Sequence, residues 1–146
     1  MGYCISKNKS KFAIRAGDVP SAFKALQDLG VGQNDDRAHG ASFEHGRQTA
    51  RWFSWMNGCD PSSWKSISDA MSDWRYPVTL DETGSVVSID FDGEKIGDEN
   101  VMFAAIAPFV AKGSFLELQG EDGALWRWVF DGKAMREVQA KISWEK

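Results

Sequence analysis

The chain lacks most of the features that mark extracellular, membrane-spanning and nucleic-acid-binding proteins. Its 146 residues contain 2 cysteines, and no segment after Met1 resembles the apolar core of a signal peptide. The longest apolar candidate, residues 101–111, is interrupted by Pro108 and is shorter than the roughly 18 residues that cross a bilayer. The formal net charge of −4 argues against a basic surface for phosphates. We therefore expect a soluble cytoplasmic protein with free thiols, no membrane partner and little affinity for nucleic acids.

Motifs for the common reaction types are also missing. Neither G-x-G-x-x-G nor G-x-x-x-x-G-K occurs, and no G-x-S-x-G elbow precedes the serines at 62–68. Cys4 and Cys59 are the strong nucleophiles of the chain, and neither stands in a recognisable nucleophile context. The sequence therefore predicts no cofactor and favours a non-catalytic role, without deciding that question.

The clearest structural signal lies in residues 114–144, where two glycine-marked turns separate three runs of alternating apolar and polar residues. This pattern predicts an antiparallel three-stranded meander. A three-residue first loop ending at Gly123 puts apolar residues on one face and a charge pair on the other. The predicted opposite pairs are Leu116 with Trp128, Glu117 with Arg127, and Leu118 with Trp126.

The second loop of the meander decides where the third strand lies. A three-residue loop at 131–133 would place Glu137 beside Arg127 and Val138 beside Trp126. A two-residue turn would instead oppose Arg127 to Arg136, so we prefer the longer loop.

The rest of the chain shows strand and helix patterns in alternation. Apolar residues recur at helical spacing after Asp18, after Asp60 and after Asp98, each of which suits a helix cap. The second of these helices should bury Trp64, Ile67, Met71 and Trp74. The predicted order is β-α-β-α-β-β-α-β-β-β in a single domain. Because hairpins outnumber crossovers, we predict an α+β fold with helices packed on one face of a mainly antiparallel sheet.

Residues 31–50 form the least patterned part of the chain, which predicts a long, mobile polar loop. It holds both histidines, His39 and His45, among carboxylates. These residue types suit a metal or an acid-base pair. The spacing of the two histidines matches no metal signature, so we expect no metal and keep this loop as a weak candidate site.

Seven tryptophans are many for this length, and most should lie in the core. Trp52 and Trp55, on a predicted short strand at 51–56, are candidates for exposed tryptophans that stack on a sugar or a base.

Three segments stand out from the rest of the chain: Met1-Gly2-Tyr3-Cys4-Ile5, the run FDGEKIG at 91–97 followed by AIAPFV at 105–110, and GEDG at 120–123 followed by WRWVF at 126–130. Together they resemble a family of small uncharacterised proteins of bacterial and phage genomes. The resemblance brings no known reaction, cofactor or catalytic residue. It implies a cytosolic accessory role, often in mobile or prophage DNA, in which the protein binds another protein.

The leading hypothesis is a non-catalytic protein-binding module, for example an inhibitor of a defence factor or toxin. Its predicted surface is the meander face with Glu117, Arg127 and Glu137, together with the polar loop around His39 and His45. The alternatives are an enzyme of unrecognised type at the His39 and His45 loop, and a sugar- or base-binding domain that uses the exposed tryptophans. Self-association through the edge strand that ends near residue 144 also stays open, although Lys141 and the pair Glu145-Lys146 are also typical of a protected edge.

Overall fold

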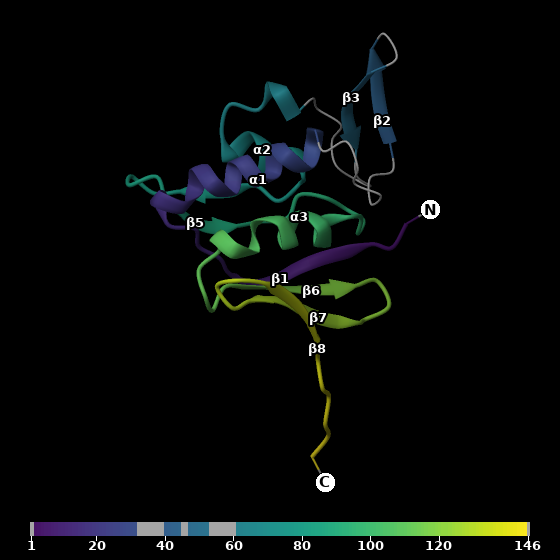
Figure 1. Cartoon of the computed structure of the whole chain (residues 1–146). Helices are drawn as coiled ribbons and strands as arrows, with labels where there is room; N and C mark the ends of the chain where they lie inside the picture. The colour runs from purple at the N-terminus through teal and green to yellow at the C-terminus, as the bar shows by residue number, and fades with distance from the viewer. Residues whose placement is uncertain (1, 32–39, 45–46, 53–60, 146) are drawn as a thin grey trace.

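The computed structural model describes residues 2–31, 40–44, 47–52 and 61–145 (Figure 1). It confirms the predicted α+β class. The helices are α1 (Val19–Val31), α2 (Ile67–Asp73) and α3 (Glu99–Ile106), with 3-10 turns at Ala16–Asp18, Pro61–Ser63 and Ala107–Phe109. The strands are β1 (Ile5–Lys11), β2 (Gly40–Glu44), β3 (Arg47–Trp52), β4 (Val78–Leu80), β5 (Val86–Ile89), β6 (Phe115–Gly120), β7 (Leu125–Phe130) and β8 (Met135–Gln139). In these parts of the chain, no helix is both long enough and apolar enough to span a membrane.

The described strands form three antiparallel sheets. The largest has the order β1-β6-β7-β8, and the pairs β2-β3 and β4-β5 are separate hairpins. An isolated bridge between Ile14 and Val86 ties the chain after β1 to the β4-β5 hairpin. Figure 1 shows the helices on one side of the four-stranded sheet, with α3 between that sheet and α1. The opposite side of this sheet carries no helix in the described part of the chain.

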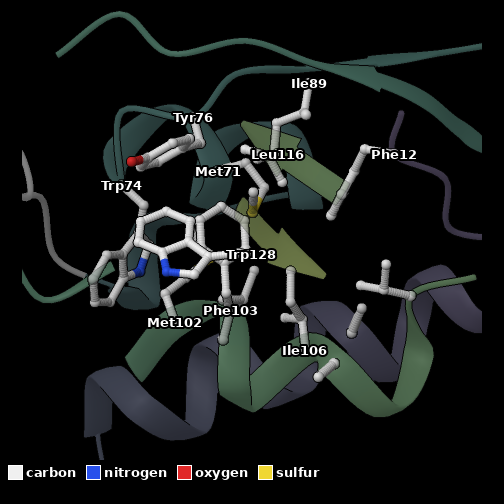
Figure 2. Close-up of a cluster of buried hydrophobic side chains, with 14 of the residues drawn as sticks. Phe12, Met71, Trp74, Tyr76, Ile89, Met102, Phe103, Ile106, Leu116 and Trp128 are labelled. Carbon is white, nitrogen blue, oxygen red and sulfur yellow. The ribbon is translucent and has the colours of Figure 1, made fainter. Parts of the chain in front are cut away.

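Aromatic side chains hold the sheet and the helices together, with Phe103 of α3 at their centre (Figure 2). Its ring centre lies 5.2 Å from that of Trp128, 5.0 Å from that of Tyr76 and 6.0 Å from that of Phe130. Most of these contacts are edge-on or tilted, the arrangements that the ring quadrupole favours. As expected, several tryptophans belong to this core: Trp64, Trp74, Trp126 and Trp128 are buried.

The second helix is shorter than predicted. Ser66 caps it, because its side chain accepts a hydrogen bond from the backbone N–H of Asp69 at 3.4 Å. The predicted cap, Asp60, lies outside the described residues. The predicted burial is nevertheless confirmed, since Trp64, Ile67, Met71 and Trp74 are all buried. Only Ile67 and Met71 lie within α2, because Trp64 precedes its cap and Trp74 follows its last residue.

The third helix begins where the sequence indicated, but its cap differs. Asp98 takes the cap position without making a side-chain capping bond, and the carboxylate of Glu99 accepts a hydrogen bond from the backbone N–H of Gly97 instead. Pro108 falls in a 3-10 turn that follows the α-helix, as its missing N–H requires. Gly113 then adopts a φ of 90°, which favours glycine.

The middle of the chain differs most from the prediction. Where a loop was predicted over residues 31–50, the structure has the β2-β3 hairpin, with α1 ending at Val31. The strand predicted at 51–56 overlaps β3 at Arg51 and Trp52, and residues 53–56 lie outside the described residues. The pattern was missed because polar residues alternate with few large apolar ones in both strands, so the period-2 signal was weak.

Candidate functional site

The candidate site lies on the face of the four-stranded sheet that points away from the helices. Along β6 and β7 the even-numbered residues are buried, while the odd-numbered residues are half-buried or exposed. The predicted register of these strands is confirmed, with Leu116 opposite Trp128 and Glu117 opposite Arg127. The outer face therefore carries the charge pair that the sequence predicted.

Arg127 is held in a defined orientation on this face. Its Nε and Nη2 lie 2.9 Å and 2.8 Å from Oε1 of Glu117, and its guanidinium carbon lies 4.5 Å from the centre of the Phe115 ring. The side chain of Arg127 is 43% exposed and that of Glu117 is 14% exposed. A pair as exposed as this adds no more than about 1 kcal/mol to stability. Its main consequence is geometric, because the ion pair and the aromatic ring together fix the plane of the guanidinium.

Apolar side chains flank Arg127 and are only half-buried. Phe115, Leu125, Val129 and Val138 all share this intermediate exposure. A shallow cavity of 330 Å³ opens where β7 begins and β8 ends. Its lining residues are Glu117, Leu125, Trp126, Arg127, Val138, Gln139, Ala140 and Lys141. A fixed arginine beside apolar surface and a recess is the composition found at the centre of protein interfaces.

Glu137, the third residue of the predicted meander surface, does not lie beside Arg127. Val138, not Glu137, is opposite Arg127, so the predicted register of β8 was wrong by one residue. Glu137 lies opposite Trp128, where its Oε1 accepts a hydrogen bond from the indole Nε1 at 3.1 Å. Glu137 also accepts a bond from Gln139 Nε2 at 3.1 Å. It therefore covers the edge of the core, and it does not belong to the Arg127 face.

The physical reason for this shift is the loop between β7 and β8, which has four residues. Phe130 pairs with Met135, so residues 131–134 form the connection. Oδ1 of Asp131 accepts hydrogen bonds from the backbone N–H groups of Lys133 and Ala134, each at 2.8 Å. These hydrogen bonds stabilise a loop of four residues in place of the predicted three. Because one extra loop residue shifts the register of β8 by one, Glu137 moves to the other face of the sheet.

The other predicted candidates fall outside the described side chains. His39, His45 and Trp55 lie outside the described residues, and Trp52 is described only as the last residue of β3. Within the ranges that the structure describes, no group of three or more His, Cys, Asp or Glu side chains could hold a metal ion. The metal, enzyme and sugar-binding hypotheses therefore receive no support from the described geometry.

The strongest pKa shift among the described groups belongs to a buried pair. Burial raises the pKa of Tyr76, and the neighbouring carboxylate of Glu99 raises it further. Tyr76 donates a hydrogen bond of 2.8 Å to Glu99 Oε2, and both residues are buried. The cavity on the outer sheet face does not include them. We interpret this pair as a link between the chain after α2 and the start of α3.

Sequence reasoning missed the apolar part of the candidate surface. Phe115 and Val138 were assigned only to strands, although alternation already placed Phe115 on the same face as Glu117. The cavity itself had no sequence signal, because it depends on where β8 leaves the sheet.

Comparisons of the chain with protein-family models, with curated proteins and with solved structures found no match. The candidate surface therefore rests on its own geometry.

Proposed function

We propose that the protein is a non-catalytic protein-binding module that acts through the outer face of its four-stranded sheet. In this proposal it is a small cytosolic accessory protein of bacterial or phage origin, and inhibition of a defence factor or toxin is the role we favour. The observation that carries the proposal is the fixed orientation of Arg127 between Glu117 and Phe115, on a sheet face that no described helix covers.

The chemistry of this face suggests how a partner would be recognised. The guanidinium of Arg127 has more N–H donors than Glu117 uses, and 43% of the side chain is exposed. A carboxylate or backbone carbonyl of the partner could accept the remaining bonds. Half-buried Val129 and Val138 would then be covered at little cost in side-chain entropy, because β-branched side chains have few rotamers.

Affinity capture tests this proposal directly. The tagged protein is expressed in cells of its source, and co-purifying proteins are identified by mass spectrometry for the wild type, Arg127→Glu and Arg15→Glu. Arg15 is an exposed arginine outside the described strands, so its reversal changes the net charge equally. We expect a stoichiometric partner with the wild type and Arg15→Glu, and loss of that partner with Arg127→Glu.

A fold control accompanies the capture. Urea midpoints within error of one another would show that the three proteins are equally folded. A partner that Arg127→Glu retains would exclude this surface. An empty capture from folded wild-type protein would count against the binding module itself.

A further inference from the structure

The segment after β8 exposes large apolar side chains without a partner surface in the described chain. Figure 1 shows it running away from the sheet toward the C label. Ile142 is 75% exposed and Trp144 is 89% exposed, whereas Val87, another exposed large apolar residue, is 47% exposed. We call residues 140–145 the arm. Apolar side chains as exposed as these are typical of a contact site.

The arm continues the alternation of β8. Val138 lies on the outer face of the sheet, opposite Arg127, and the apolar residues that follow it keep the same spacing of two. On this outer side the sequence places Val138, Ala140, Ile142 and Trp144. On the other side it places Gln139, Lys141, Ser143 and Glu145. This is the pattern of a strand that has one apolar face to cover.

The backbone of β8 offers an open edge for pairing. β8 is the last strand of its sheet, and the N–H of Ala140 donates to the carbonyl of Leu125 in β7 at 3.1 Å. Because backbone groups of successive residues point to opposite sides of a strand, those of Gln139 and Lys141 point to the open side. An edge of this kind is a template for a strand from another chain.

We infer that β8 and the arm pair with the same segment of a second copy of this protein, antiparallel about a two-fold axis at Ala140. The two four-stranded sheets then join into one continuous sheet. In this register Ala140 faces Ala140 of the second copy, Val138 faces Ile142, and Arg136 faces Trp144. All three are non-hydrogen-bonded pairs, in which side chains approach most closely, so each apolar residue gains an apolar or cation-π neighbour.

The polar side of the segment is compatible with the same register. Gln139 faces Lys141 of the second copy, and Lys141 lies diagonal to Glu137, within reach of a long side chain. A two-fold axis one residue later would set Lys141 against Lys141 and Glu137 against Glu145. Like charges directly opposite each other are destabilising, so the pairing about Ala140 is favoured over this alternative.

The expected interface is small, which predicts a reversible dimer. Two tryptophan side chains would remove about 300–500 Å² from water, against about 1,200–2,000 Å² in a stable interface of standard size. Backbone pairing and the apolar pairs add to this area. We therefore expect monomer and dimer to exchange with concentration.

Mass measurement over a concentration series is the first test. We expect the wild type to shift from 16.2 kDa toward twice that mass as concentration rises, and Ile142→Ser and Trp144→Ser to lose the shift. Val87→Ser is the matched control, since it removes an exposed apolar side chain from β5, and it should keep the shift. A wild type that stays monomeric, or a dimer that Trp144→Ser retains, would overturn the inference.

Disulfide crosslinking tests the register. Single cysteines are introduced by Ala140→Cys or Ile142→Cys in a Cys4→Ser, Cys59→Ser background. Facing residues in a non-hydrogen-bonded pair have Cα atoms about 4.5 Å apart, which a disulfide can span. Two copies of residue 142 would lie about 13 Å apart along the strands, too far for a bond. We expect a covalent dimer with Ala140→Cys alone, and crosslinking through residue 142 instead would refute the register.

This inference concerns backbone pairing at the edge of the sheet, whereas the proposed function concerns Arg127 on its outer face, and the two surfaces share Val138. A monomer that still captures a partner through Arg127 would overturn the dimer and leave the binding module intact. A dimer that captures no partner would support the pairing of two copies and count against the binding module.

Discussion

The buried pair of Tyr76 and Glu99 allows a quantitative test of what holds the fold together. Glu99 is 1% exposed and Tyr76 is fully buried, and their side chains are joined by a hydrogen bond of 2.8 Å. Glu99 also accepts a bond from the N–H of Gly97. A carboxylate removed from water in this way depends on its donors, because an unpaired buried charge is strongly unfavourable.

Tyr76→Phe removes one of these donors and leaves the ring. The ring contacts with Phe91 and Phe103, at 4.8 Å and 5.0 Å between centres, should persist, so little packing is lost. A hydrogen bond to a charged group contributes about 1.5–3 kcal/mol. We therefore expect the free energy of unfolding to fall by about 2 kcal/mol, with an unchanged dependence on urea concentration.

The same substitution in a Glu99→Gln background separates charge from shape. Glutamine keeps the size of the side chain and removes the charge, and a neutral hydrogen bond contributes about 0.5–1.5 kcal/mol. Tyr76→Phe should therefore cost about 1 kcal/mol less in this background, which urea unfolding of the four proteins of the double-mutant cycle would measure. Equal costs in both backgrounds would refute the argument that Tyr76 stabilises a buried charge. Tyr3→Phe is the control, because the other tyrosine also bonds a carboxylate, that of Asp122, at an exposed position, and its loss should change stability less.

Two further predictions concern the turns. Gly120→Ala should lower the urea midpoint, because a Cβ there would clash with the hydroxyl of Tyr3. An equal loss in a Tyr3→Ala background would contradict this clash. Hydrogen bonds lower the folded-state pKa values of Asp81, Asp122 and Asp131 below the usual 3.8. The largest contribution comes from the side chain of Thr83 for Asp81 and from the side chain of Tyr3 for Asp122. For Asp131 it comes from backbone N–H groups. Their stabilisation is thus complete above the unfolded pKa and is lost as pH falls through the lower folded values. Urea midpoints should therefore decline below about pH 4. If the variant with all three aspartates changed to asparagine declines as steeply, the loss of stability in acid comes from other groups.

The two loops of the meander show what the sequence could and could not predict. The register of β6 and β7 followed from alternation and from Gly123, which adopts a φ of 87°, as the predicted loop requires. The register of β7 and β8 failed because the carboxylate of Asp131 bonds two backbone N–H groups and adds a loop residue. Loops of three and four residues suit the same sequence here, and side-chain bonding in the folded loop decides between them.

The candidate surface was predictable only where it depends on neighbouring strands. The pair of Glu117 and Arg127 is local to one hairpin, so alternation was sufficient to predict it. The link between Tyr76 and Glu99 joins residues 23 positions apart and depends on the packing of α3. The spacing of apolar residues within one helix or strand cannot predict such a contact.

The two edges of the four-stranded sheet differ in a way that bears on where another chain can pair. β1 carries a register shift between Lys7 and Ser10, and Lys9 and Lys11 on it are exposed. Bulges and lysines are the devices by which natural sheets discourage edge pairing. β8 has a continuous register with β7, and its apolar alternation extends beyond Gln139 into the arm. Since β8 lacks the register shift that interrupts β1, strand addition should be directed to β8, which places a second chain next to the Arg127 face and not at the opposite edge of the sheet.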